Sequence, residues 1–507
     1  MSRDTESGTS FTSISPAEFF YRNKQMAGFG NPSQAVYSAV RELVENSLDA
    51  CEDALCLPDV KVKISTDESS ILTITVSDNG IGLPYSEVPQ AFGRVLYGSK
   101  YDRRQRRGTF GLGVTMAVLY GQITTDSPVI IHTQVNDNPG HRFQLLIDVE
   151  KNEPIIEDEK TAMRNTAGTT VTIRLRGDLK RAQDRIIEYL QLTSAGTPYA
   201  RIEYEINDST DVILGPWTSD LPRLTHSCKP HPRAVDMELL RRLISDSKEA
   251  NLRAFLIASF QQLGTKTASK FLSFLGIEPQ TPLATLSRKD LSRLSLAMRR
   301  FDGFGRPESS CLSPIGEKSF IRGVKSIFNT SYLKFAQYGI FEWEGNPVLV
   351  EGVLAIGDEF PSAEVPTLYR FANRVPLLYD ASEDVLTKVL RRINWSRYGV
   401  SRPQPIAVFL NVSSTRIPYK AAGKQSIAHV TEIETGALAL LRLLGRSLNR
   451  TIATIGAAAR DTRKRREYSE MIRIVAKYGS ALANQENVPS TKSIVEKLFE
   501  VDANDKE

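Results

Sequence analysis

The segment RELVENSLDA at residues 41–50 holds the residues best placed for chemistry. Apolar residues recur at helical spacing through residues 36–55, so we expect a helix there. On a helix Glu42 and Asn46, four residues apart, share one face, and Asp49 falls on that face too. A carboxylate and an amide side by side can divide two tasks, because one activates a water molecule and the other supplies an oxygen ligand to Mg²⁺. The alternative is an amphipathic helix whose polar face is merely solvated.

A second polar motif, DNGIG at residues 78–82, follows an apolar run at 71–76 that is typical of a strand. Asp78 can accept a hydrogen bond from an exocyclic amine at this position. Gly80 and Gly82 would let the backbone approach a flat ring closely. The alternative is a DNG turn that only joins two strands.

A glycine-rich segment, GTFGLG at residues 108–113, leads into the apolar helical stretch VTMAVLY. Glycines before the start of a helix expose backbone N–H groups, and these can cradle phosphates. Such a loop alone is weak support for a nucleotide site, and the pair Gly168-Thr169 before the strand-like run TVTIRL is weaker still.

A P-loop, the competing phosphate-binding motif, is excluded by the order of its residues. Gly93 and Gly98 have the required separation, but Ser99 and Lys100 stand in the wrong order.

The elements that must position these motifs form an α/β pattern from about residue 15 to about 204. The segment 83–115, rich in Gly and Arg, is expected to be a mobile loop. The pattern predicts an α/β sandwich with a mixed sheet. Strands are expected at residues 60–64, 71–76, 129–134, 142–149 and 169–175.

The remainder of the chain divides into a helical part and a second α/β part. Residues 206–230 are typical of a connection, and residues 232–304 are entirely helical in pattern. A second α/β unit then follows, so the fold class is multidomain α/β (α+β). Its expected elements are strands at 348–356 and 405–411, helices at 382–393 and about 424–480, and a last helix near 490–501.

Composition limits the class of protein more than its function. The 507 residues correspond to roughly three domains. No window approaches the ~18 uncharged apolar residues of a membrane span, and the polar N-terminus lacks the apolar core of a secretory signal. The net charge of +5 does not predict nucleic-acid binding, so any DNA contact depends on local clusters.

The four cysteines are scattered without metal-ligand spacing, and we expect reduced structural thiols in an intracellular protein. With five histidines in the chain, no zinc site is expected. The cysteines are Cys51, Cys56, Cys228 and Cys311.

The order of the four motifs resembles the Bergerat-fold (GHKL) ATPase family, which includes gyrase B, MutL, heat-shock chaperone ATPases and histidine kinases. The resemblance implies ATP and Mg²⁺ as cofactors. Glu42 would be the general base, Asn46 would hold Mg²⁺, and Asp78 would bind the adenine amine. Catalysis of this kind depends mainly on positioning and charge neutralisation. The lid and the remaining nucleotide contacts would comprise Asp49, Gly80, Gly82, Ser99, Lys100, Gly108, Gly111, Leu112, Gly113 and Thr169.

A narrower resemblance covers nearly the whole chain. The segment 91–122 is similar to the lid of topoisomerase VI B subunits, except that Thr109-Phe110 replaces a polar pair. The helical part around LGTKTASKFL resembles their helix-two-turns-helix domain. CLSPIGE at 311–317 and RFANRVPLLYD at 370–380 match their pattern as well.

The segment RIPYKAAGKQSIA at 416–428 resembles the loop that carries the switch lysine of this family, here Lys424. An ammonium group on the terminal phosphate of ATP gains a charge-assisted hydrogen bond that is lost when the phosphate leaves. Lys424 would therefore join the catalytic and ATP-binding residues and set the angle between two domains.

The resemblance implies the ATP-hydrolysing B subunit of a type IIB DNA topoisomerase. Its partners would be double-stranded DNA, a second copy of this chain in an ATP-dependent homodimer, and a cleaving A subunit in an A2B2 heterotetramer. It would be cytoplasmic in an archaeon or nuclear in a eukaryote. The alternatives are an ATP-dependent DNA clamp or scaffold without strand passage, and a chaperone or mismatch-repair ATPase. Domains are expected at 1–228, 229–306 and 307–482, with a tail at 483–507.

Candidate DNA contacts are few, and each has a simpler interpretation. In NWSRYG at 394–399, Ser396 stands where the family tends to have a lysine, so a phosphate contact would depend on Arg397. Lys180, Arg181 and the run 463–466 are further candidates. The alternative for each is a solvated helix face.

Overall fold

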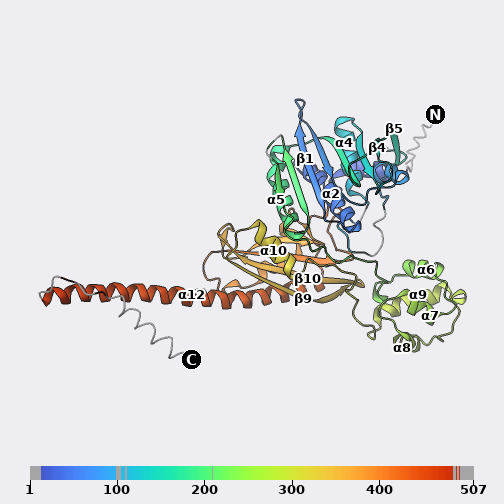
Figure 1. Ribbon diagram of the computed structural model, residues 1–507. Helices are drawn as coiled ribbons and strands as arrows, with labels where there is room; N and C mark the ends of the chain where they lie inside the picture. The colour runs from blue at the N-terminus through green and yellow to red at the C-terminus, as the bar shows by residue number, and fades with distance from the viewer. Residues whose placement is uncertain are drawn as a thin grey trace, which may run out of the picture.

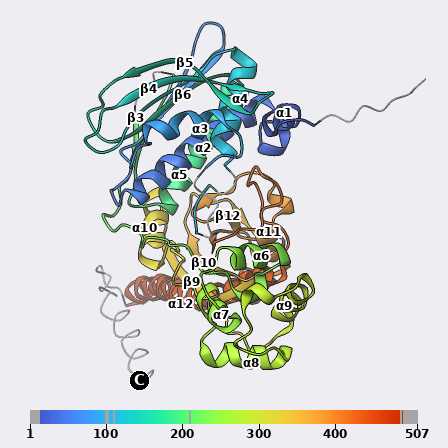
Figure 2. The ribbon, with the colours of Figure 1, turned by 90° about the vertical axis from the view of Figure 1, so that its right-hand side faces the viewer.

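The computed structural model describes residues 13–98, 104–108, 111–207, 209, 211–483, 487 and 490. An N-terminal α/β unit sits on a C-terminal α/β unit, and a small helical module lies beside the latter (Figures 1 and 2). This arrangement agrees with the predicted multidomain α/β class.

The N-terminal unit is built on an eight-stranded sheet in the order β5-β4-β3-β6-β2-β1-β7-β8. All neighbours are antiparallel except β1 and β7, which pair in parallel, so the sheet is mixed as predicted. The strands are β1 Asp59–Thr66, β2 Ile71–Ser77, β3 Val129–Gln134, β4 His141–Asp148, β5 Glu153–Thr161, β6 Gly168–Arg176, β7 Arg201–Ile206 and β8 Val212–Leu214.

Three helices pack on one face of this sheet, namely α2 (Pro32–Asp53), α4 (Gly113–Thr125) and α5 (Leu179–Gly196). The burial of β2 alternates residue by residue, as expected for a strand with one face on a core. Two short helices, α1 (Pro16–Arg22) and α3 (Val88–Gly93), complete the unit. The helix α2 thus lies in the middle of the core that it shares with α4 and α5.

The helical module has an apolar core of its own, to which Phe255, Phe271 and Met298 contribute buried side chains. Its last helix begins with a capping box formed by Ser287 and Asp290, which satisfies backbone N–H groups at the helix start. The helices are α6 Met237–Ser245, α7 Leu252–Ser259, α8 Thr265–Leu275 and α9 Arg288–Arg300.

The C-terminal unit is a six-stranded sheet in the order β13-β12-β14-β10-β9, with β11 paired to β14. Every residue of β10 but the last is buried, because helices cover both faces of the sheet. The elements are β9 Tyr332–Trp343, β10 Asn346–Ile356, β11 Ser362–Ala363, β12 Thr367–Ala372, β13 Val375–Pro376, β14 Gln404–Ser414, α10 Glu317–Ile327 and α11 Val385–Arg392.

The last described helix, α12 (Thr431–Leu482), begins on this sheet and then extends far beyond it (Figure 1). Its fully buried residues, such as Leu440 and Leu448, lie in its first third. The prediction that this helix begins near residue 424 was wrong, since residues 419–428 form a loop that folds back toward α2. Among the described helices none is long and apolar enough to cross a membrane.

Other sequence-based expectations also need correction. The segment 83–115 is not one continuous mobile loop, because it contains α3. The sequence did not predict β5, β7, β9, β12, α5 or α10. The helix expected at 490–501 lies outside the described residues, apart from residue 490, which is in no helix.

The expectation of four reduced cysteines was wrong for two of them. Cys228 and Cys311 form a disulfide with a Cα–Cα distance of 6.1 Å, whereas Cys51 and Cys56 are free thiols. The connection between the first unit and the helical module runs past the turn that precedes α10. This path brings together two cysteines 83 residues apart.

The separate core of the helical module leads to a prediction. Phe255 is completely buried there, and Phe255→Ala should destabilise the module by about 3–5 kcal/mol, because the change leaves a cavity. Hydrogen exchange should then rise across residues 237–300 while that of α2 stays unchanged. Faster exchange in α2 as well would contradict the independence of this core.

Candidate nucleotide site

The helix α2 positions the first group of candidate residues. Asn31 caps it by accepting a hydrogen bond from the backbone N–H of Gln34, and Pro32 occupies the first helical position. Glu42 is 6% exposed, Asn46 is half-buried, and the two lie one turn apart on this helix. The predicted helix and the spacing of the two residues are confirmed.

Glu42 belongs to a buried cluster of four charges. The Lys424 Nζ lies 3.0 Å from Glu45 Oε2 and 3.4 Å from Glu42 Oε2. Arg41 contacts both carboxylates and donates a hydrogen bond to the Gly423 carbonyl at 2.8 Å. The cluster is electrically balanced, with two cations and two carboxylates, which is how proteins tolerate charges away from water.

The cluster changes how its carboxylates bind protons. Burial alone would raise the pKa of Glu42, but Lys424 and Arg41 outweigh burial and lower it from 4.5 to about 2. Burial raises the pKa of Glu45 in spite of its contact with Lys424. Glu42 is thus firmly ionised but a weak base while Lys424 stays beside it.

Lys424 reaches this position from a tight turn. Its φ of 50° is in the left-handed region, which a lysine rarely adopts, and its N–H bonds to the Ala421 carbonyl. A bridge between Tyr419 and Ile427 closes the loop, and the buried Asp384 carboxylate accepts a hydrogen bond from the Ile427 N–H. Strain of this kind persists only where the surroundings enforce it, and it is common at functional sites.

Asp78 lies at the end of β2 and is 6% exposed. Its carboxylate accepts hydrogen bonds from Ser47 Oγ at 2.9 Å and from the N–H groups of Gly80 and Thr169 at 3.0 Å each. Burial raises its pKa, while these bonds oppose the shift. A fixed carboxylate of this type is a good acceptor for one N–H group of a ligand.

Two glycines permit close approaches around α2. A Cβ on Gly80 would lie 2.7 Å from the Ala50 carbonyl carbon. A Cβ on Gly113, the first residue of α4, would lie 1.7 Å from Glu42 Oε2. The start of α4 therefore lies directly against the candidate base, where its first N–H groups form an electropositive helix end.

Comparisons with known proteins match the two α/β units separately. The family model for histidine kinase-, DNA gyrase B- and HSP90-like ATPases matches residues 31–179, and the model for the topoisomerase VI B subunit transducer matches residues 307–465. The B subunit of type 2 DNA topoisomerase 6 from Metallosphaera sedula is 44% identical over 84% of this chain and 81% of its own length. The protein of that name from Saccharolobus solfataricus is 39% identical over 97% and 95%.

The chain belongs to the family of topoisomerase VI B subunits. It therefore combines a GHKL ATPase domain, which binds ATP, with a transducer domain, as expected of the ATP-driven B subunit of a type IIB topoisomerase. Among solved structures, the N-terminal domain of a DNA repair protein has a TM-score of 0.43 at 13% identity, covering 86% of this chain and 99% of that one. That likeness is too distant to support a functional conclusion.

Within this topoisomerase VI B chain, five of the other candidate nucleotide contacts lie at two places. Gly82 and Thr169 flank Asp78, whereas Gly108, Gly111 and Leu112 precede α4. The Asp49 carboxylate accepts a hydrogen bond from Arg107 at 3.0 Å. Four lid residues, Ser99, Lys100, Thr109 and Phe110, lie outside the described residues.

The candidate DNA contacts lie on three helices. Lys180 and Arg181 are exposed in the first turn of α5, and Arg181 pairs with Asp178. Arg397 is exposed in a short 3-10 helix beside the buried Trp395, and the neighbouring Ser396 bonds to Asn394. Lys464 and Arg466 are exposed on α12, while the side chains of Arg463 and Arg465 are not described.

Several site residues were missed in the sequence. Arg41 and Glu45 complete the charge cluster, Ser47 holds Asp78, and the Arg164 guanidinium donates to the Asp78 carbonyl at 2.9 Å. The first three lie inside the RELVENSLDA segment, whose density of charge was a usable signal. Arg164 lies between strands, and nothing in its local sequence indicates its role.

The contact between Gly113 and Glu42 leads to a prediction for hydrolysis. Gly113→Ala places a methyl group where the Glu42 carboxylate lies, so ATP turnover should fall by about 10²-fold as the base is displaced. Gly479→Ala, which meets no atom within 4 Å on α12, is the matched control and should hydrolyse ATP normally. Normal turnover by Gly113→Ala would contradict the close placement of α4 and the base.

Proposed function

We propose that this chain hydrolyses ATP with Glu42 and uses Lys424 to convert the state of the nucleotide into a movement of the transducer. The observation that carries the proposal is the burial of Lys424 beside Glu42, across 382 residues of sequence and between two domains. A type IIB topoisomerase needs such a link, because its ATP site must act on a distant DNA gate.

In the hydrolysis step Glu42 orients a water molecule for in-line attack on the γ-phosphorus and takes up its proton. The bond to ADP breaks as the bond to water forms, so the products are ADP and phosphate. Asp78 accepts the adenine amine, and the residues before α4 present N–H groups to the phosphates. Asn46 fits Mg²⁺, since its amide oxygen on α2 is a hard ligand and Mg²⁺ usually keeps few protein ligands besides phosphate and water.

Lys424 competes for two sets of anions in this scheme. Without a terminal phosphate its ammonium group rests between Glu42 and Glu45, where it keeps Glu42 a weak base. With ATP bound, Lys424 moves onto the γ-phosphate. The pKa of Glu42 then rises, so the base gains strength only when a substrate is present.

We assign the chain to an ATP-dependent homodimer within an A2B2 heterotetramer that passes one DNA duplex through another. The surface that supports a contact with the cleaving A chain is the end of α12, which exposes apolar side chains at helical spacing, including Tyr468, Met471, Val475 and Tyr478. Lys180, Arg181 and Arg397 remain proposed contacts with the DNA backbone. The N-terminal residues that would reach the second copy of this chain lie mostly before residue 13, the first that is described.

The proposed domains are an ATPase domain with its N-terminal strap (1–228), a helix-two-turns-helix domain (229–306), a transducer (307–482) and a tail (483–507). Separate apolar cores in the first three support this division. In the cell we expect the protein wherever chromosomal DNA lies.

The role of Glu42 leads to the first prediction. Glu42→Ala should bind ATP and dimerise, yet its turnover should fall by about 10²-fold or more, because no carboxylate remains to orient the water. Nucleotide binding, crosslinked dimer and phosphate release are measured in parallel. Normal phosphate release would remove Glu42 from this role.

The role of Lys424 leads to the second prediction. Lys424→Ala should bind ATP but lose hydrolysis by about 10²-fold, as for other losses of a transition-state charge contact. It should also lose strand passage. Lys420→Ala, which removes a partly exposed lysine from the same loop, is the control and should keep both activities. Unchanged strand passage by Lys424→Ala would refute the switch.

The whole assembly is tested by relaxation and decatenation of plasmid DNA. This chain, its cleaving A chain and the two together are compared, with and without ATP. Strand passage that needs both chains and ATP supports the proposal. Hydrolysis without strand passage under any condition would favour an ATP-dependent DNA clamp instead.

A further inference from the structure

Two transducer motifs that the nucleotide chemistry does not use converge on the ATPase domain. Ser313 belongs to CLSPIGE, and Asn373 and Arg374 belong to RFANRVPLLYD. In the structure, Ser313 and Asn373 bond directly to the segment Arg104–Arg107, which lies immediately before the first lid glycine, Gly108. We name the segment Arg104–Arg107 the lid stem.

The lid stem is bonded to the transducer through uncharged groups. The Gln105 amide donates to the Ser313 carbonyl at 3.0 Å and accepts from the Ser313 N–H at 2.7 Å. The Asn373 amide donates to the Arg106 carbonyl at 3.2 Å and to the Ser414 carbonyl at 2.9 Å. These hydrogen bonds join the lid stem directly to the transducer.

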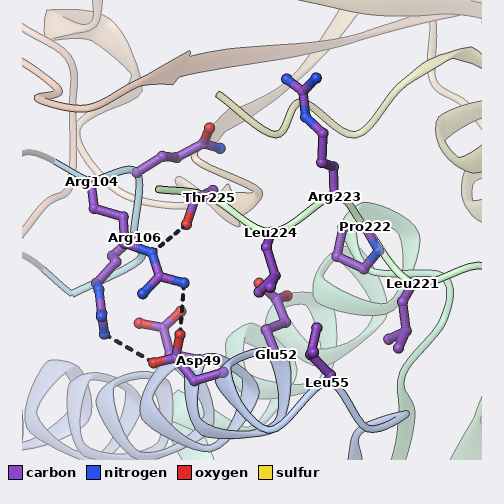
Figure 3. A pocket seen from close by; sticks show the side chains of 12 residues that line it. Asp49, Glu52, Leu55, Arg104, Arg106, Leu221, Pro222, Arg223, Leu224 and Thr225 are labelled. Carbon is purple, nitrogen blue, oxygen red and sulfur yellow. Dashed lines mark hydrogen bonds and ion pairs between the residues drawn. The ribbon is translucent and has the colours of Figure 1, made fainter. Parts of the chain in front are cut away.

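The other side of the lid stem is held on the last turns of α2 by charge. Arg107 donates to Asp49 at 3.0 Å and to Glu52 at 2.7 Å. Arg104 and Arg106 both contact Asp53, and Figure 3 shows where they lie above α2. This is the same helix that carries Glu42 and Asn46 nearer its middle.

Arg374 connects the two sides directly. Its guanidinium donates to Glu52 at 3.2 Å, to the Tyr199 hydroxyl at 3.1 Å and to the Ser313 carbonyl at 2.7 Å. Glu52 therefore lies between Arg107 of the lid stem and Arg374 of the transducer. All of these groups are buried or nearly so, which makes their geometry specific.

Arg374 has a backbone conformation that an arginine rarely adopts. Asn373 and Arg374 form the two-residue turn between β12 and β13, with φ values of 48° and 71°. Hairpin turns of this kind favour glycine at the second position. The Arg374 N–H is nevertheless held by the Asn411 side chain at 3.1 Å. The turn therefore holds an arginine in a backbone conformation that suits glycine better.

The loop that carries Ser313 is equally well fixed. The buried Glu351 carboxylate accepts hydrogen bonds from the N–H groups of Ile315 and Gly316, at 2.7 and 2.9 Å, and from the Asn411 amide. Asn411 therefore joins the loop to the Arg374 turn. The lid stem therefore bonds to a part of the transducer that is itself cross-linked by buried hydrogen bonds.

We propose that the lid stem, held between Glu52 of α2 and Ser313 and Arg374 of the transducer, is a second joint that transmits nucleotide binding in front of α4 to the transducer independently of Lys424. This inference rests on the proposed function, in which the residues before α4 present N–H groups to the phosphates of ATP. Gln105 and Arg374 are positioning residues in this joint, since both act through the lid stem and α2 rather than on the nucleotide.

Two substitutions separate this role from folding. Arg374→Gly removes the guanidinium from Glu52 and Ser313 while relieving the backbone of its turn. Gln105→Ala removes both hydrogen bonds to Ser313 without changing any charge. Arg374→Lys keeps a cation near Glu52 and should recover part of the effect. Lys61→Ala, which removes an exposed cation from the same domain, is the control.

The experiment measures strand passage per ATP hydrolysed by the complete enzyme, together with KM for ATP. Arg374→Gly and Gln105→Ala should lower the ratio by about 5-fold or more, as for loss of a typical coupling free energy, with little change in KM. A merely structural defect would change both together. An unchanged ratio in both variants would overturn the proposal.

A second measurement needs only this chain. Fluorescent probes on α5 and α11 report the distance between ATPase domain and transducer with and without a non-hydrolysable ATP analogue. The nucleotide-dependent change should shrink in Arg374→Gly and in Gln105→Ala but not in Lys61→Ala, and equal changes in all of them would overturn the joint. If the unmodified enzyme fails to pass strands, the proposed function fails, while this measurement still decides the joint.

Discussion

The ammonium group of Lys424 is buried between two carboxylates of another domain, and much of the molecule serves to hold it there. A lysine in this position must find anionic partners, because removing one partner of a buried ion pair costs about 3–5 kcal/mol. The strained loop of the transducer, the Asp384 bond that closes it and the Arg41 contact with Gly423 all direct Lys424 toward α2. Any phosphate that reaches the site competes with Glu42 and Glu45 for the same cation.

The helix α2 receives contacts from the transducer at two places. Lys424 meets it at Glu42 and Glu45, and Arg374 meets it at Glu52. Glu42 and Glu52 are about 15 Å apart along the helix axis. Together with the packing of α5 on α10, these two contacts restrict how the domains can rotate relative to each other. The candidate nucleotide site therefore lies on the helix that both transducer contacts reach.

The sequence predicted those helices and strands whose contacts follow from the pattern of their own residues. The periodicity of α2 and the β-branched runs of β1, β2 and β3 depend on one apolar face, so their residues alone predict them. The strand β5 is different, because its residues are acidic and largely exposed, and it forms by pairing at the edge of the sheet. Likewise β7 pairs in parallel with β1 across 142 residues, which no local pattern indicates.

The site residues divide in the same way, into those that the local sequence indicates and those that only the folded chain brings together. The spacing placed Glu42 and Asn46 on one helix face, and the order of the motifs led to the ATPase family that implies their roles. The partners of Glu42 and Glu52 come from residues 424 and 374, and only the folded chain brings them together. The position of Lys424 was inferred from family resemblance alone, since its own sequence context is that of an ordinary surface loop.

Because α12 is long, a small change of angle at its base would move its far end over a large distance. From Leu448 in the transducer core to its end at Leu482 the helix extends about 51 Å. A pivot of about 10° at the sheet would move the far end by about 9 Å, so under the proposed function the helix would act as a lever arm that amplifies a change of angle. The length of α12 determines how far its tip moves for a given change of angle. Its twist of about 100° per residue determines which side chains face outward at the tip. Adding or removing one helical turn would change the distance that the tip moves but would hardly rotate its side chains about the helix axis. Two extra residues would instead turn the apolar side chains of the tip to nearly the opposite direction.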